Sequence, residues 1–227
     1  MSYQFHFGDV WDAWRELLDG TLVTLWLSAL SMALSLALAI LGALARTGGP
    51  RPLRALVGAY VELVRNTPFL VQALFIFFGL PALGVRLEVD LCALIALTLN
   101  GSAYAIEIVR AGIESVGHGQ VEAARALGLH PLRAFRLVVL PQALRVVVPP
   151  LGSQFILLML NSSVVSVISA NELTGAAQDI QGRTFRSFEA YLVAAGIYLV
   201  LSLGFSGALA GLERAALGRR PAVARRA

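Results

Sequence analysis

Five long runs of apolar residues dominate the chain, and shorter stretches rich in charge, glycine or proline separate them. A transmembrane helix needs about 20 consecutive apolar residues because it crosses roughly 30 Å of hydrocarbon. Its backbone polar groups must all be paired within the helix. The runs are long enough for this and contain no clusters of turn residues. We predict five membrane-spanning helices, at residues 21–45, 54–80, 90–113, 144–168 and 190–212.

The composition agrees with a membrane protein. Of the 227 residues, 57% are hydrophobic and only 14% are charged, and the mean hydropathy is +0.74. These values lie well beyond the balance found in soluble domains. We therefore expect an all-α integral membrane protein in which residues 1–227 form a single transmembrane domain. A nucleic-acid-binding protein would need a soluble basic face, and the apolar runs leave no room for one.

The arginines are distributed unevenly between the two sides of the predicted spans. The chain has no lysine, so all 18 of its basic residues are arginines. Thirteen of the 18 lie after the first span, around the segment after the third span, or after the fifth span: Arg46, Arg51, Arg54, Arg110, Arg125, Arg133, Arg136, Arg145, Arg214, Arg219, Arg220, Arg225 and Arg226. Because cytoplasmic loops are enriched in basic residues, we expect the N-terminus outside and the C-terminus in the cytoplasm. The first twenty residues carry four acids and one arginine, the reverse of a cleavable signal peptide.

The stretch "EAARALGLHPLRAFRLVVLP" at residues 122–141 is charged and interrupted, although apolar runs flank it. A short helix over 120–127 suits its pattern, Gly128 can adopt the left-handed conformation that ends a helix, and Pro131 can begin the next one. We predict a helix–bend–helix on the cytoplasmic surface, within residues 117–141. An amphipathic helix lying passively at the membrane surface would also explain this pattern.

The spacing in this stretch resembles the signature loop of the permeases of binding-protein-dependent ABC importers. That loop reads Glu-Ala-Ala, three residues, Gly, nine residues, an aliphatic residue, one residue, Leu-Pro. The matching positions are Glu122, Ala123, Ala124, Gly128, Val138, Leu140 and Pro141. Residues 62–81, 103–120 and 140–168 resemble the polar amino acid branch of this family, which includes histidine, glutamine and arginine permeases. The resemblance covers roughly residues 20–215, with departures at Ile106, Gly117, His118 and Asn161.

The resemblance implies a type I ABC importer fold and a division of labour between subunits. The chain would form the path for an amino acid through the bacterial inner membrane, and its 117–141 loop would couple that path to a separate ATPase. The residues that would contact the ATPase are Glu122, Ala123, Ala124, Gly128, Leu140 and Pro141. The implied partners are the ATPase, a second permease copy or paralogue, an external solute-binding protein, the amino acid and the lipid bilayer.

The residues themselves argue against catalysis in this chain. A phosphate-binding loop needs a lysine that reaches the β and γ phosphates of ATP, and the chain has none. Its three histidines, His6, His118 and His130, lack the spacing of metal ligands on one helix. We therefore expect no catalytic residue, metal or cofactor here, and we expect ATP and Mg²⁺ to bind the partner ATPase.

Polar residues inside the predicted spans are candidates for the substrate path, because they are costly in lipid. Pro68 should kink the second span and free backbone carbonyls, and interrupted helices form substrate sites in transporters. The candidates are Asn66, Thr67, Pro68, Tyr104, Glu107, Asn161, Ser162 and Ser163. We expect Thr67, Asn161 and Ser162 to face a shared cavity.

The acids in these spans bear on the substrate. We expect Glu62 with Arg65, and Glu107 with Arg110, to neutralise each other across one helical turn. The remaining polar candidates include no unpaired acid, which favours a neutral polar or broad-range amino acid over a cation.

A stand-alone secondary transporter or channel is the alternative reading, in which the 117–141 segment is merely an interfacial helix. Five spans without an internal inverted repeat count against it. Residues 169–189, between the last two spans, should lie outside as a connecting loop or as a contact for the binding protein. The sequence leaves open which amino acid is carried and whether two identical permeases pair.

Overall fold

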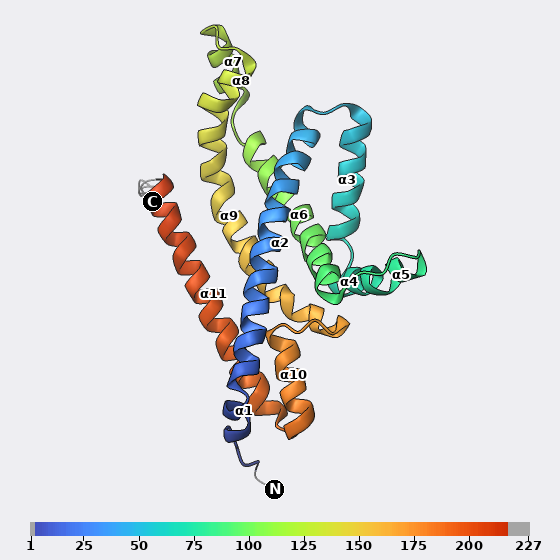
Figure 1. The fold of residues 1–227 in the computed structure, drawn as a ribbon. Coiled ribbons are helices and arrows are strands. Elements are labelled where there is room, and N and C mark those ends of the chain that lie inside the picture. The colour runs from blue at the N-terminus through green and yellow to red at the C-terminus, as the bar shows by residue number, and fades with distance from the viewer. Residues whose placement is uncertain (1–2, 218–227) are drawn as a thin grey trace.

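A computed structural model describes residues 3–217, in which all regular structure is helical (Figure 1). The C-terminal arginines Arg219, Arg220, Arg225 and Arg226, which we expected in the cytoplasm, lie outside the described residues. The elements are α1 (Gly8–Asp12), α2 (Trp14–Gly48), α3 (Arg51–Arg65), α4 (Phe69–Leu74), the π-helix η1 (Phe75–Gly79), α5 (Leu80–Ala82), α6 (Val89–Glu114), α7 (His118–Ala126), α8 (Pro131–Ala134), the π-helix η2 (Phe135–Val139), α9 (Leu140–Asn161), the 3₁₀ helix η3 (Ser162–Ile168), α10 (Leu173–Thr184) and α11 (Ser187–Leu217).

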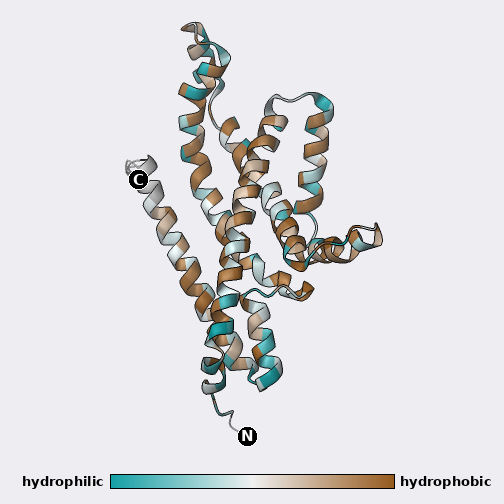
Figure 2. Ribbon diagram, in the orientation of Figure 1, coloured by the Kyte–Doolittle hydropathy of each residue, from teal (hydrophilic) through white to brown (hydrophobic). Residues whose placement is uncertain are grey.

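Four of these segments are long and apolar enough to cross a membrane: Trp14–Gly48, Val89–Glu114, Pro131–Ile168 and Ser187–Gly211. The bent pair Arg51–Arg65 and Phe69–Ala82 provides a fifth if it counts as one span. Figure 2 shows hydrophobic residues along the middle of the long helices and hydrophilic residues gathered toward the two ends. The expected all-α architecture is therefore confirmed, with four candidate spans, or five if the bent pair counts as one.

Small residues let α2 approach its neighbours closely. Its buried face carries Ser35 and Gly42, and α2 packs most extensively against α6. A Cβ built at Gly42 would lie 2.6 Å from the Cδ1 of Ile106, so any larger residue there would force the Ile106 side chain to move. The Ser35 hydroxyl donates a hydrogen bond of 3.0 Å to the backbone carbonyl of Thr98. These small residues of α2 therefore serve helix packing.

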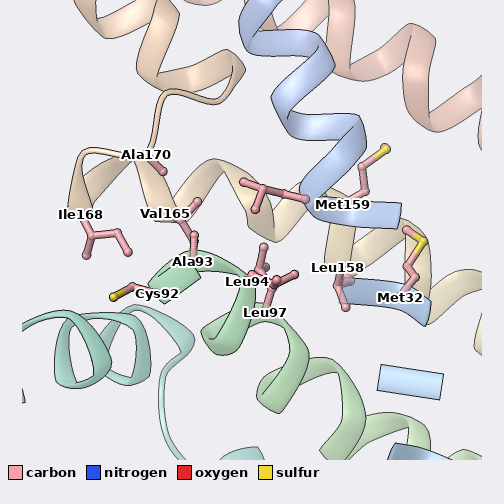
Figure 3. Packing of buried hydrophobic residues seen from close by; sticks show 11 residues of the cluster. Met32, Cys92, Ala93, Leu94, Leu97, Leu158, Met159, Val165, Ile168 and Ala170 are labelled. Atoms are coloured by element: carbon pink, nitrogen blue, oxygen red, sulfur yellow. The ribbon is translucent and has the colours of Figure 1, made fainter. Parts of the chain in front are cut away.

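The central core joins α2, α6, α9 and η3. Figure 3 shows side chains from all four elements interdigitating around Leu97 and Met159, each no more than 1% exposed. Phe69 and Leu74 of α4 pack against the same cluster. This core therefore fixes η3 and the half of the second span that follows its break.

The second span breaks sharply where we expected only a kink. The helices α3 and α4 meet at 109° across residues 66–68. Pro68 is extended, with φ −63° and ψ 136°, it has no backbone N–H, and it disfavours helical geometry at Thr67. The segment after the break runs aside from the bundle (Figure 1).

The fourth span is longer than its apolar run. It continues without interruption from α8 through η2 and α9 to η3, although Pro149 and Pro150 lie inside it. The expected second half of the 117–141 segment is therefore the beginning of this helix, and a movement of one end can be transmitted along it.

The expected external loop at residues 169–189 contains a packed helix, α10. It contacts α2 closely at Gly20 of α2, since a Cβ built at Gly20 would lie 3.0 Å from the Cα of Leu173. Glu172 caps α10 by accepting hydrogen bonds from the backbone N–H groups of Thr174 (3.0 Å) and Gly175 (2.8 Å). Burial raises the pKa of the Glu172 carboxyl. The segment is therefore more than a simple connecting loop, which was one of the two alternatives left open, and its contact with a binding protein stays a prediction.

Candidate functional site

A cavity of about 470 Å³ lies where α3 faces α6 and the end of α2. Its size falls in the range of small-molecule sites. Polar groups dominate its wall, which comprises Arg46 from α2, Val61, Glu62 and Arg65 from α3, Asn66 from the break, and Tyr104, Glu107 and Arg110 from α6. Three of the expected path residues, Asn66, Tyr104 and Glu107, therefore line one cavity.

Glu107 is the centre of an ion-pair network. Its Oε1 lies 2.6 Å from the Nη1 of Arg46, and its Oε2 lies 2.7 Å from the Nη2 of Arg110. Arg110 also pairs with Glu114 at 2.5 Å, one turn further along α6. The expected Glu107–Arg110 pair is confirmed. Arg46 was missed as a partner because it lies 61 residues away in sequence; its place among the arginines beyond the first span was the only signal.

The expected pair of Glu62 and Arg65 does not form. Arg65 instead places its guanidinium over the ring of Tyr104, with Cζ 5.3 Å from the ring centroid. Over residues 3–217, no salt bridge involves either Glu62 or Arg65. One carboxylate and one guanidinium on the cavity wall thus remain available for a ligand.

Gln72 stabilises the break in the second span, and the sequence reasoning missed it. Its Nε2 donates to the carbonyls of Val64 (2.7 Å) and Thr67 (3.1 Å), which the break leaves without helical partners. Its Oε1 accepts a 3.0 Å hydrogen bond from the Nδ2 of Asn100 on α6. A glutamine four residues after a proline was the available signal, but only the tertiary fold supplies Asn100.

Of the three residues expected to face a shared cavity, Thr67, Asn161 and Ser162, the structure leaves Ser162 facing no open space. Ser162 is fully buried, and its hydroxyl donates to the carbonyl of Met159 at 2.7 Å. Ser163 donates in the same way to Leu160 at 2.7 Å. These residues begin η3, which packs on α4 beyond the break. Their role in a substrate path stays a prediction.

The 117–141 segment has the bend that its sequence predicts. Gly128 has a φ of +80°, in the left-handed region that favours glycine. Its backbone N–H donates to the carbonyl oxygen of Arg125 at 2.9 Å, and the backbone N–H of Leu129 donates to the carbonyl oxygen of Ala124 at 3.2 Å. This pair of bonds is the Schellman motif that ends a helix. Pro131 then begins α8.

The bent segment is fixed on one side and exposed on the other. Ala124 is buried, whereas Glu122, Ala123, Leu140 and Pro141 are exposed. A small apolar cluster of Val116, Val139 and Ala143, with Val121 packed against it, joins α7 to α6, η2 and α9. Three large apolar side chains point to solvent nearby: Leu127 (83% exposed), Leu132 (71%) and Leu137 (63%). Such a surface is typical of a protein contact.

Comparisons with known proteins cover nearly the whole chain. The probable glutamine ABC transporter permease protein GlnM of Bacillus subtilis is 38% identical over 205 residues, which are 90% of this chain and 95% of that protein. The glutamine transport system permease protein GlnP of Escherichia coli is 37% identical over 213 residues, which are 93% of this chain and 97% of that protein.

Solved structures agree in fold. A crystal structure of an amino acid ABC transporter with histidines has a TM-score of 0.88 and 37% identity, covering 94% of this chain and all of that one. An inward-facing MetNI methionine ABC transporter has a TM-score of 0.69 at 21% identity, covering 93% and 98%, and shows likeness of fold alone. Residues 23–217 match the family described as binding-protein-dependent transport system inner membrane component, and the chain belongs to this family.

Proposed function

We propose that this chain is the permease subunit of an importer for a neutral polar amino acid, of which glutamine is the first candidate. As a member of its family, the chain is a multi-pass inner-membrane subunit, and ATP hydrolysis lies in a separate partner subunit. Importers of this kind also require a second permease and a solute-binding protein. The substrate class, the roles of single residues and the orientation belong to the proposal.

The assignment of an amino acid as the substrate rests on the unpaired Glu62 and Arg65 on the cavity wall. A free amino acid presents one ammonium and one carboxylate, which complement the carboxylate of Glu62 and the guanidinium of Arg65. Asn66 and Tyr104 add neutral polar groups to the same wall. The names of the relatives support glutamine among neutral amino acids.

The charge balance of the cavity favours a side chain without positive charge. Arg46, Arg65 and Arg110 on its wall outnumber the two carboxylates, Glu62 and Glu107. Glu107 is already bound by two arginines, so no free acid remains there for a second ammonium group. A cationic amino acid would face a net positive wall.

The 117–141 segment transmits ATPase closure to the membrane. The exposed residues Glu122, Ala123, Leu140 and Pro141 contact the partner, and Gly128 sets the bend between them. The continuous helix from Pro131 to Ile168 provides a mechanical link from this surface into the spans. The end that carries this segment also carries the α2–α3 turn with its arginines (Figure 1), which supports a cytoplasmic position and an external N-terminus.

Direct binding of ligand to the purified permease–ATPase complex tests the substrate assignment. We expect radiolabelled glutamine to be retained without the binding protein, and N-acetylglutamine, which lacks the ammonium group, to compete poorly. Glu62→Gln should weaken retention on the order of tenfold, by the loss of one charged hydrogen bond. Glu88→Gln, which removes the same charge before α6 and outside the cavity, is the control. Retention that is unchanged in Glu62→Gln, or equal for both ligands, contradicts the assignment.

A further inference from the structure

A second basic cavity lies beside the first and shares Arg46 and Arg110 with it, and the proposed function assigns it no role. It measures about 400 Å³ and lies between the end of α2, the beginning of α3 and the end of α6. Its lining is Arg46, Arg51, Arg54, Ala55, Arg110 and Glu114. Four of these six residues are arginines and one is an acid, so the wall has a formal charge of +3.

The acids nearby do not neutralise this wall. Glu114 is already bound to Arg110 at 2.5 Å, and Glu107 is shared between Arg46 and Arg110. Counting Glu107 with the wall still leaves a charge of +2. Arg51 and Arg54 are exposed and take part in no salt bridge within residues 3–217. Two guanidinium groups at the mouth of the cavity are therefore free to bind an anion.

The surroundings of the mouth resemble those of a membrane interface. Arg51 and Arg54 occupy the first turn of α3, directly after the turn that ends the long apolar helix α2. Further along α3, Leu56 (68% exposed) and Leu63 (66%) lie seven residues apart on one exposed face. A molecule with a charged head and an apolar tail matches this order of positive and apolar surface.

We propose that this cavity binds the phosphate group of an anionic phospholipid of the inner leaflet, whose acyl chains lie along Leu56 and Leu63. Arg51 and Arg54 hold the phosphate by charge-assisted hydrogen bonds. Basic pockets between membrane helices on the cytoplasmic side are suited to such headgroups. The choice of leaflet rests on the proposed orientation, whereas the binding itself depends neither on the orientation nor on the transported substrate.

The test titrates the delipidated permease–ATPase complex with phosphatidylglycerol, phosphatidylcholine or inorganic phosphate while its thermal unfolding midpoint is recorded. Phosphatidylglycerol should raise the midpoint of the wild type, because a ligand that binds only the folded state stabilises it. Phosphatidylcholine and inorganic phosphate should have little effect at equal concentration. A rise of equal size with inorganic phosphate would identify a site for free anions, and an equal rise with phosphatidylcholine would identify a general need for lipid; either overturns the proposal.

Variants test whether the rise in the unfolding midpoint comes from lipid bound at this cavity. The double variant Arg51→Gln/Arg54→Gln should need roughly tenfold to thirtyfold more phosphatidylglycerol for the same rise, since each arginine near the surface contributes roughly a fivefold gain. The control Arg15→Gln/Arg86→Gln removes the same charge away from the cavity and should respond like the wild type. An equal response in all three proteins overturns the proposal. If the double variant does not assemble, Arg54→Gln alone should need about fivefold more phosphatidylglycerol for the same rise. An unchanged requirement in Arg54→Gln also overturns the proposal.

Discussion

At the scale of single residues, Glu107 holds two helices together through its arginines. Glu107→Gln leaves Arg46 and Arg110 partly buried without their shared carboxylate, and we expect the free energy of unfolding to fall by about 1–3 kcal/mol. Thermal unfolding of the assembled complex measures this loss. Glu114→Gln is the matched control, because its side chain is 52% exposed and such surface pairs contribute less than about 1 kcal/mol. Equal losses in the two variants would show that the network has no special role.

Some contacts of these residues could be predicted and others could not. The Glu107–Arg110 pair follows from a spacing of three residues on one helix. The same rule failed for Glu62 and Arg65, because Arg65 places its guanidinium over the ring of Tyr104 instead. Spacing predicts which side chains can meet, and the tertiary packing decides which of them do.

At the scale of elements, the break between α3 and α4 depends on Gln72. Gln72→Leu keeps a similar volume but leaves the carbonyls of Val64 and Thr67 without their donor, and we expect a loss of about 1–3 kcal/mol in the free energy of unfolding, with reduced uptake. Gln142→Leu removes a single exposed hydrogen bond to Val138 on one helix and should cost less than about 1 kcal/mol. Chemical denaturation of both variants provides the comparison. Equal stability of Gln72→Leu and the wild type would contradict the role assigned to Gln72.

The secondary-structure elements differ in how well they can be predicted from the sequence. Long apolar runs identified the five spans because lipid demands about 20 apolar residues of each. The helix α10 escaped notice since its buried face consists partly of Gly175, Ala176 and Ala177, which bury little apolar area. Pro68 predicts an interruption of the helix. The 109° angle between the two halves of the span depends on contacts with α6, which the local sequence cannot predict.

At the scale of the whole molecule, the proposed orientation rests on the arginines gathered at one end. A cysteine at the exposed position of His130, in a Cys92→Ala background, should react with an impermeant thiol reagent only after the membrane is opened. A cysteine at Ser187, the first residue of α11, which begins at the end of the bundle opposite α7 and α8 (Figure 1), should react in intact cells with the outer membrane permeabilised. The reverse labelling pattern would refute the proposed orientation.

The most direct measurement of the central claim, that the 117–141 segment couples the spans to an ATPase, is the ATPase rate of reconstituted complexes with and without loaded binding protein. Gly128→Val forces a β-carbon into a left-handed residue, at a strain of about 1 kcal/mol or more, and displaces the exposed surface from its partner. Gly119→Val is the control, because Gly119 also has open space around it but lies within α7 at an ordinary φ. We predict that loaded binding protein stimulates ATP hydrolysis in the wild type and in Gly119→Val, and that Gly128→Val assembles but loses this stimulation. Full stimulation in an assembled Gly128→Val complex would contradict the account.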